Sequence, residues 1–278
     1  METKLPGPIE LLKEAIGITR DRFWTLVGII LIPSLLGILV GGIVVGGVFG
    51  IAALSSKSFL ASIGLGIPLV ILVVAALLVL QTWSYTALIF AIKDSKERIG
   101  VVESFRRGWD KVRSVLWVSA LLSATILGGF LLLAIPGIIF VVWFVFAIYI
   151  VIAENEKGLN ALLKSREYVR GRWWGVVWRL VAFTLIYLPV FLIPTVLLTL
   201  AKVAWVTSVL NFVISVLLGI VGAVYYYLVY YHLRETKGEF SFAPSEKARK
   251  FFVFIAIPVS VLFLLAILAL IAFLALRP

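Results

Sequence analysis

The chain contains no cysteine and a single histidine, His232. The absence of cysteine excludes disulfide bonds and thiolate chemistry, and one histidine without cysteine does not build a zinc site. Charged residues are also scarce, at 14% of the chain against about 25% in soluble domains. No acidic residue falls inside the long apolar runs, so no general base is available there to activate a serine or threonine. We therefore expect a protein that is not an enzyme and that holds no metal and no cofactor.

Hydrophobic residues make up 63% of the chain, and apolar runs longer than about 18 residues recur along it. The mean hydropathy of +1.15 lies far outside the range of soluble globular proteins. The sequence therefore predicts an all-α, polytopic transmembrane helical bundle. Its net charge of +11 comes from basic residues that flank the apolar runs. We expect anionic membrane lipids as their partners, and no nucleic acid.

Seven membrane-spanning helices are predicted, a six-span core plus one. The stretch 112–153 corresponds to roughly 63 Å of helix, enough for two crossings of a bilayer core about 30 Å thick. We place the break between these two spans at Pro136–Gly137, because proline disfavours helix at the residue before it. The other spans are predicted at 23–54, 59–92 (starting near Pro68), 173–200, 203–231 and 251–276.

Amphipathic segments separate the spans. In 5–22 and 93–113, apolar residues recur at three- and four-residue steps, which is typical of helices that lie in the membrane interface. The charged segment 154–178 holds the same place before the next span. The tyrosine-rich end of 203–231 predicts an aromatic girdle at the level of the lipid headgroups.

The distribution of charge predicts the orientation in the membrane. Nearly all of the 25 basic residues fall on one side of the predicted spans, and only Lys57, Lys202 and Arg277 fall on the other. The positive-inside rule then places the N-terminus in the cytoplasm and the C-terminus outside. The amphipathic segments would accordingly lie on the cytoplasmic face.

A pattern of one basic and two aromatic residues opens several spans, at Arg22-Phe23-Trp24, Arg172-Trp173-Trp174 and Lys250-Phe251-Phe252. A looser copy pairs Ser104 with Ser165 and Trp117 with Trp178, which sets Lys111 opposite Arg172. The predicted inward spans end alike, at Asp94-Ser95, Glu154-Asn155 and Glu235-Thr236, where the polar residue is expected to cap the next helix.

These matches predict approximate parallel repeats within a single membrane domain, 1–278. The repeat units are roughly 5–92, 93–153 and 154–231, with 251–276 as the extra span. Each unit consists of an interfacial helix, an outward span and an inward span. The alternative explanation is that the likeness reflects only the composition shared by membrane interfaces.

The stretch 134–178 combines the Pro136–Gly137 break, an aromatic-rich span, Glu154 at its end, then Ala161, Ser165, a basic residue and a tryptophan pair. In these features it resembles a group of prokaryotic, uncharacterised integral membrane proteins related to the glycerophosphoryl diester phosphodiesterase membrane domain. The resemblance implies a bundle of about six spans in the plasma membrane of a prokaryote. It supplies no catalytic residues, and no soluble phosphodiesterase domain accompanies the match.

Our leading hypothesis is a non-enzymatic protein that binds or moves lipids or other amphipathic substrates at the cytoplasmic leaflet. Clustered cations near an anionic leaflet contribute about 1 kcal/mol each to such binding. The candidate headgroup-binding residues are Arg22, Arg107, Lys111, Lys164, Arg170, Arg172 and Lys250. The expected interface anchors are Trp24, Trp109, Trp117, Trp173, Trp174 and Trp178.

Two alternative functions stay open. Gln81 and Asn211 are the strongest polar groups within the predicted spans, where they either form interhelical hydrogen bonds or line the path of a small-solute transporter or channel. A membrane assembly or scaffold subunit is the other alternative, with a protein partner of unknown identity. Glycines at GxxxG spacing in 23–54 favour packing within the chain, with a homo-oligomer as the alternative.

Overall fold

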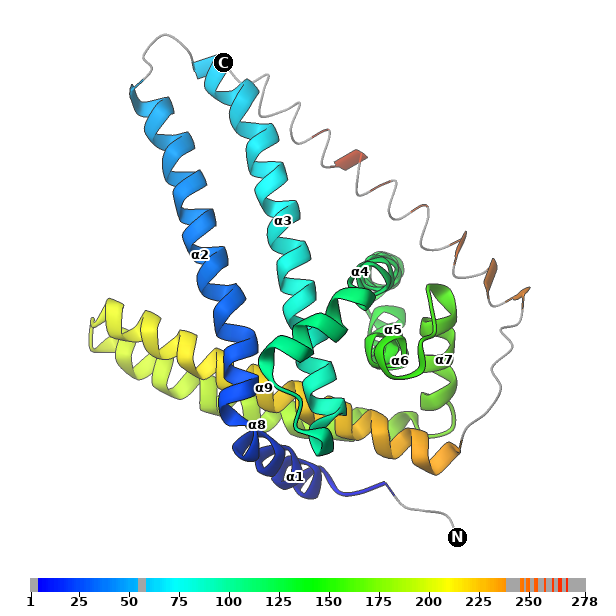
Figure 1. The fold of residues 1–278 in the computed structure, drawn as a ribbon. Helices are drawn as coiled ribbons and strands as arrows, with labels where there is room; N and C mark the ends of the chain where they lie inside the picture. Colours follow the sequence, from blue (N-terminus) through cyan, green and yellow to red (C-terminus); the bar gives the residue numbers. More distant parts are fainter. Residues whose placement is uncertain are drawn as a thin grey trace. The chain divides into compact units, whose positions relative to one another are not determined.

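The computed structural model describes residues 5–54 and 59–238, together with positions 246, 247, 249, 250, 253, 254, 258, 262, 265, 266 and 269. Within this part of the chain every regular element is a helix, as the composition predicts (Figure 1). The helices are α1 (Pro8–Asp21), α2 (Phe23–Leu54), α3 (Phe59–Lys93), the short 3₁₀ helix η1 (Ser95–Glu97), α4 (Val101–Leu132), α5 (Ala134–Phe144), α6 (Ala147–Glu154), α7 (Leu159–Val169), α8 (Trp173–Leu200) and α9 (Ala204–Lys237).

Six helical stretches in the described residues are long and apolar enough to cross a membrane. They lie in α2, α3, α4, α8 and α9, and in α5 and α6 taken together. These six correspond to the predicted six-span core, and the chain is an integral membrane protein. The predicted seventh span, 251–276, lies largely outside the described residues.

The chain divides into two compact units that are interleaved in sequence. Unit 1 comprises Met1–Ala15, Arg113–Val190 and Tyr225–Pro278. Unit 2 comprises Ile16–Val112 and Phe191–Val224. The boundaries fall inside α1, α4, α8 and α9, so each of these helices contributes to both units.

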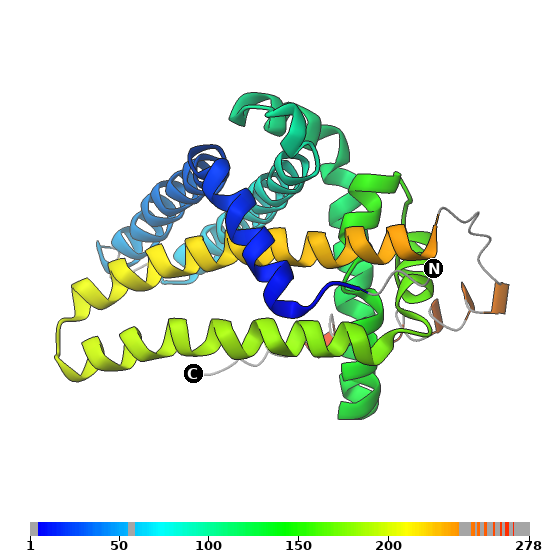
Figure 2. The same cartoon turned by 90° about the horizontal axis from the view of Figure 1, so that it is seen from below.

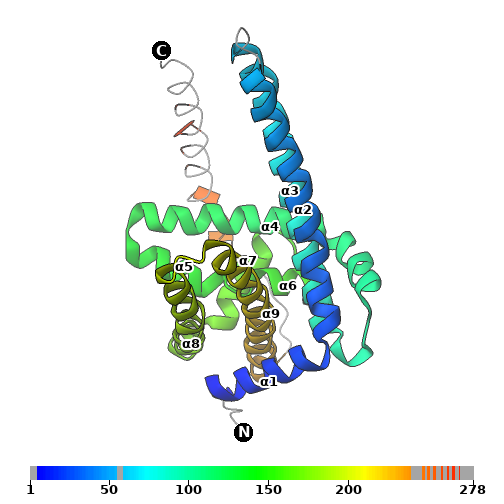
Figure 3. The same cartoon turned by 90° about the vertical axis from the view of Figure 1, so that its left-hand side faces the viewer.

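In unit 2, α2 and α3 run side by side as an antiparallel hairpin (Figures 1 and 3). The Ser84 hydroxyl of α3 donates a hydrogen bond to the carbonyl of Ile29 on α2, at 2.8 Å. A methyl group added to Gly37 of α2 would lie 3.2 Å from the Leu77 side chain, so this glycine serves packing within the hairpin. The first turns of α4 pack on α3 at Gly108, where an added methyl group would lie 3.0 Å from the backbone nitrogen of the facing residue on α3.

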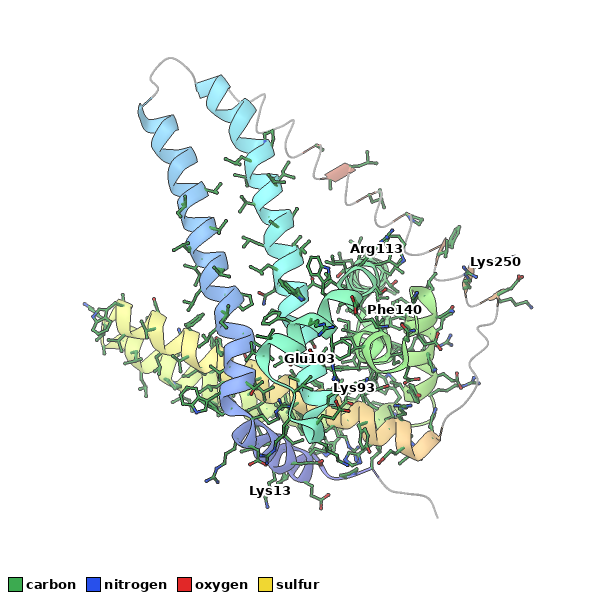
Figure 4. All side chains as sticks on the ribbon, viewed as in Figure 1. Lys13, Lys93, Glu103, Arg113, Phe140 and Lys250 are labelled. Carbon is green, nitrogen blue, oxygen red and sulfur yellow. The ribbon has the colours of Figure 1, made fainter. Side chains whose placement is uncertain are left out.

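In unit 1, α4 and α5 form a tight turn. A methyl group added to Gly129 of α4 would lie 2.9 Å from the Cα of Gly137 on α5, so the two backbones nearly touch. Phe140 of α5 is buried at this contact (Figure 4). The helix breaks at Leu133, whose backbone is extended, and not at the predicted Pro136–Gly137. Pro136 instead lies in the first turn of α5, where a missing N–H costs no hydrogen bond.

A second break divides this span between α5 and α6, at Val145–Phe146. The hydroxyl of Ser165 on α7 donates to the carbonyl of Trp143 at 2.7 Å and accepts from the N–H of Phe146 at 3.3 Å. Ser165 is fully buried. Irregular backbone at membrane depth is tolerated where protein groups satisfy it, and here one serine does so. The sequence carries no proline or glycine at this break, so the sequence did not predict it, although Ala134–Glu154 as a whole is long and apolar enough to be one span.

Three local expectations are corrected. The predicted interfacial helix 93–113 is not a separate helix. Its first part holds the end of α3, η1 and a short loop, and from Val101 onward it continues into the following span as one helix, α4. Asn155 does not cap α7. It ends α6 with left-handed backbone (φ 60°), while Gly158 precedes α7. Thr236 lies inside α9, and Ser95 lies in η1.

The predicted aromatic girdle at the end of α9 is also wrong. Tyr225 and Tyr230 are buried inside unit 1. Tyr225 stacks on Phe183 of α8 at 4.8 Å between ring centroids. Tyr230 stacks on Tyr149 of α6 at 6.0 Å. A helix face that is rich in tyrosine therefore forms core here, because neighbouring helices supply both aromatic surface and hydrogen-bond partners.

Candidate functional site

The corner between α6 and α7 is built around the carboxylate of Glu154, the last residue of α6. Its Oε1 accepts hydrogen bonds from the hydroxyl of Tyr168 on α7 (3.0 Å) and from that of Tyr230 on α9 (2.5 Å). Its Oε2 lies 2.7 Å from Lys164 Nζ, which also contacts Glu156 at 3.1 Å. Glu154 thus ties three helices of unit 1 together.

The Glu154–Lys164 ion pair is buried, with side chains 8% and 10% exposed. Burial alone lowers the pKa of Lys164, but the hydrogen bonds and charges of Glu154 and Glu156 outweigh it, so that the pKa is raised. Lys164 is therefore held charged by partners of its own chain. That geometry makes it a structural cation and leaves it little freedom to reach a headgroup.

The turn between α7 and α8 is held by the end of α9. Lys237 Nζ donates to the carbonyl of Arg170 at 2.8 Å and also to that of Glu167. On the other side of the turn, Arg172 Nη1 donates to the Thr236 hydroxyl. Gly171 between them has φ +80°, a conformation that other residues rarely adopt. The turn that carries Arg170 is consequently fixed at both ends.

An open groove lies beside this turn, between α5, α7 and the start of α8. Its volume is about 510 Å³, within the range of ligand sites. The guanidinium of Arg166 stacks over the ring of Trp143 at 4.5 Å from the centroid. Arg170 is 76% exposed and has a single long contact of 3.6 Å with Glu167. The lining residues are Ile139, Trp143, Arg166, Arg170, Gly171 and Trp173.

The groove thus brings together two guanidinium groups and two indole rings beside an apolar wall. Trp173 Nε1 is a buried donor without a hydrogen-bond partner among the described residues. Guanidinium groups bind phosphate or carboxylate oxygens in a bidentate way, and indole rings favour the membrane interface. We call this set the α7–α8 groove.

A comparable corner joins α3 and α4 in unit 2. With Ser104 aligned to Ser165, Arg107 corresponds to Tyr168, and Asp94, just after the end of α3, falls within one position of Glu154. The contacts correspond as well, since Arg107 Nη1 reaches Asp94 at 2.6 Å and the Tyr168 hydroxyl reaches Glu154 at 3.0 Å. The two corners therefore have similar contacts, and the internal repeat stays a prediction from the sequence.

The other candidate cations are largely occupied. Arg22 is buried and donates to the carbonyls of Ala91 and Ile99. Burial, and to a smaller degree the charge of Arg98, lowers the pKa of Arg22. Because its donors meet backbone carbonyls, Arg22 holds the end of α3 against the following loop.

On α4, Arg107 contacts three carboxylates, those of Asp94, Glu97 and Glu103, the last of which is labelled in Figure 4. Lys111, further along the same helix, is half-buried and also has interactions. Among the predicted cations, Arg170 is the one that lines the α7–α8 groove.

Lys250 lies 3.8 Å from Glu246 and lines a hollow whose described lining residues all fall in the stretch 246–258. A hollow lined by one segment of chain lacks the support of separate elements. Lys250 therefore carries no binding site in the described residues.

The tryptophan candidates are mostly exposed. Trp24, Trp109, Trp117, Trp174 and Trp178 present more than half of their surface. Trp24, Trp174 and Trp178 lie near the starts of the apolar stretches Phe23–Val44 and Trp173–Leu200, whereas Trp109 and Trp117 lie inside Val101–Leu131. Their role as membrane-interface anchors stays a prediction. Trp173 differs, because it is half-buried and lines the groove.

The two intramembrane polar candidates behave differently from each other. Asn211 Oδ1 on α9 accepts a hydrogen bond of 2.6 Å from the Thr195 hydroxyl on α8. That is the interhelical bond expected of a polar residue between spans. Gln81 is exposed on α3 and has no such partner on another helix among the described residues.

Arg179 was not among the candidates, although it is buried in α8. Its guanidinium donates to the carbonyls of Leu5 and Pro6, at 2.6 to 3.0 Å, and to Gly175. It therefore holds the segment before α1 against α8 (Figure 2). The sequence did contain a signal for this role, because Arg179 is a charged residue six positions inside the predicted span 173–200 and has no acidic residue nearby in sequence.

Sequence reasoning also missed Arg166 and Lys237. Arg166 had a usable signal, because it lies one helical turn before Arg170 on the same face. Lys237 had none, since its role depends on how α9 ends against a turn far away in the chain.

The fold defines the class: the chain is a polytopic, all-α integral membrane protein. No protein-family model, curated protein or solved structure matches it. The relationship to the prokaryotic membrane-protein group therefore stays a prediction that rests on 134–178.

Proposed function

We propose that the protein binds anionic amphipathic lipids, without catalysing a reaction, through the α7–α8 groove. The observation that carries the proposal is that Arg166 and Arg170 line one open groove together with two tryptophans, one of which stacks under Arg166. Two guanidiniums match the oxygens of a phosphate, and the apolar wall at Ile139 suits the start of an acyl chain.

The location of the groove favours a lipid over a soluble anion. Arg170 lies at the end of α7, and α8 begins three residues later as an apolar helix. Exposed Trp174 and Trp178 follow on the same helix. Because tryptophan prefers the headgroup level, the groove would open where lipid phosphates are concentrated.

The proposal includes an orientation and a membrane. The positive-inside rule favours a cytoplasmic N-terminus, and the resemblance of 134–178 favours a prokaryotic plasma membrane. In that orientation the groove faces the cytoplasmic leaflet, whose anionic lipids attract basic clusters.

Native mass spectrometry of the protein released from nanodiscs tests the proposal. The wild type is expected to retain phosphatidylglycerol in preference to phosphatidylcholine. The double variant Arg166→Gln/Arg170→Gln is expected to lose this preference by about thirtyfold, if each cation contributes about 1 kcal/mol.

Arg106→Gln is the matched control. Arg106 resembles Arg170 because it is 83% exposed and contacts a glutamate three residues before it, Glu103, at 3.8 Å. Unlike Arg170, it does not line the groove. Lipid retention that is unchanged in the double variant, or reduced equally by the control, would refute the proposal. A protein partner that co-purifies stoichiometrically while lipid binding is absent would favour the scaffold hypothesis.

A further inference from the structure

The α7–α8 turn concentrates positive charge that nearby acids do not balance. Arg166, Arg170 and Arg172 lie within seven residues of chain, and Lys237 joins them through its contact with the Arg170 carbonyl. Among the described residues, these four cations make one ion pair, between Arg170 and Glu167 at 3.6 Å. Arg166 meets a tryptophan ring, Arg172 a hydroxyl and Lys237 two carbonyls.

The corner at α4 shows how the same chain neutralises cations elsewhere. Arg106 and Arg107 there make four contacts of 4.0 Å or less with Asp94, Glu97 and Glu103. An uncompensated cluster is costly because like charges repel each other, and an anion of matching charge removes that cost. At the α7–α8 turn, four cations are paired with one carboxylate. This excess of positive charge is larger than a singly charged headgroup neutralises.

We infer that the ligand of the α7–α8 groove is an amphipathic phosphate monoester, a lipid whose terminal phosphate is doubly charged at neutral pH. This inference rests on the proposed function and names its ligand class. A monoester carries about two negative charges above its second pKa of about 6, and it has three free oxygens. A diester such as phosphatidylglycerol carries one charge and offers two free oxygens. Arg166 and Arg170 each supply a planar fork of hydrogen-bond donors. A phosphate with three free oxygens accepts more hydrogen bonds from these donors than a phosphate with two.

Titration of the purified protein in detergent with soluble short-chain lipids tests the class. Tryptophan fluorescence reports binding, because Trp143 and Trp173 line the groove. At about pH 7.5, short-chain phosphatidic acid is expected to bind about tenfold tighter than short-chain phosphatidylglycerol. The ratio is expected to fall toward one at about pH 5, where the monoester holds its second proton.

The outcomes separate this inference from the proposed function. Equal binding of the two lipids at both pH values would overturn the monoester class while leaving lipid binding intact. If neither lipid binds, both proposals fall. Competition with inorganic phosphate identifies the source of the phosphate group: displacement of the lipid at equal concentration would show a site for free phosphate and overturn the lipid assignment. Phosphate that competes only at far higher concentration supports it.

A charge variant sharpens the test. Glu167→Gln removes the one carboxylate paired with the cluster and keeps the side-chain shape. Because an added charge acts twice as strongly on a dianion, the preference for phosphatidic acid over phosphatidylglycerol is expected to rise about fivefold. Asp110→Asn, on an exposed position of α4, changes the net charge equally and is expected to leave the preference unchanged. An equal rise in both variants would contradict a local role for the cluster.

Discussion

The corners at α3–α4 and α6–α7 have similar supporting contacts but differ in the residues that pack on a tryptophan. In each corner, a tryptophan on the earlier helix packs against the residue that follows a buried serine. In unit 2, Trp83 packs on Phe105 and Trp109, each at 5.0 Å between ring centroids. In unit 1, Trp143 packs on Arg166. The position of Trp109 is taken by Arg170, counted from the serine of each corner.

The difference concerns the two positions that contact or face the tryptophan. Two aromatic rings pack on Trp83, whereas arginines take the corresponding positions at Trp143 and line the groove of about 510 Å³. The supporting contacts to Asp94 and Glu154 are retained in both corners. The two corners thus keep similar structural contacts, while two positions hold aromatic residues in one corner and arginines in the other.

The largest expected effect concerns the buried Glu154–Lys164 ion pair, compared with the partly exposed Asp94–Arg107 pair of the α3–α4 corner. Lys164→Met leaves Glu154 charged and buried without its cation, and should destabilise the protein by about 3 kcal/mol. Arg107→Met, in the exposed corner, should cost less. Unfolding of each variant in detergent measures the difference. Adding Glu154→Gln to Lys164→Met should recover part of the loss, and a Lys164→Met variant as stable as the wild type would contradict the ion-pair assignment.

The second largest difference in stability is expected between alanine variants of the two buried serines, Ser165 and Ser104. Ser165→Ala leaves the Trp143 carbonyl and the Phe146 N–H unsatisfied at a helix break, and should cost about 2 kcal/mol. Ser104 donates to the carbonyl of Gly100, four residues back in the chain, so that Ser104→Ala should cost less than about 1 kcal/mol. Equal losses of unfolding free energy in the two variants would show that the break does not depend on Ser165.

Exchange of the two differing positions tests the groove itself. Arg166→Phe/Arg170→Trp installs the residues of unit 2 in unit 1. The rings should fill the groove, and retention of anionic lipid should fall by about thirtyfold through loss of two cations. Thermal unfolding serves as the control, since a variant that binds no lipid and is also unfolded says nothing of the groove. Unchanged lipid retention in a folded variant would place the site elsewhere.

The smallest expected effect depends on pH. The native pKa of Lys164 is raised, so its contribution to stability is complete below about pH 10.5, the unfolded value, and is lost as the pH rises through the native pKa. The stability difference between wild type and Lys164→Met should therefore shrink only under strongly alkaline conditions. A difference that already disappears between about pH 7 and 9 would contradict the assignment.

The sequence was sufficient for the six described spans, because length and hydropathy determine them. It also predicts a repeat, through Ser104, Ser165 and the acids at span ends, and that repeat stays a prediction. It did not predict the break at Val145–Phe146 or the burial of Tyr230, because both depend on partners supplied by other helices. Orientation and the span at 251–276 stay predictions.

The candidate site was predicted only in part, for a related reason. Charge patterns identify cations but not their partners, so Arg22 and Lys164 looked like Arg170 in the sequence. Carbonyls 69 and 77 residues away occupy Arg22, and carboxylates occupy Lys164. Only the tertiary structure distinguishes the exposed cation from the two that hold helices together.

A crystal structure of the wild type grown from a lipid phase that contains phosphatidic acid tests the central claim most directly. We predict a phosphate within hydrogen-bond distance of both Arg166 and Arg170, with its acyl chains leading past Ile139, and none at Phe105 and Trp109. A groove without lipid, or lipid phosphate bound equally at the α3–α4 corner, would contradict it.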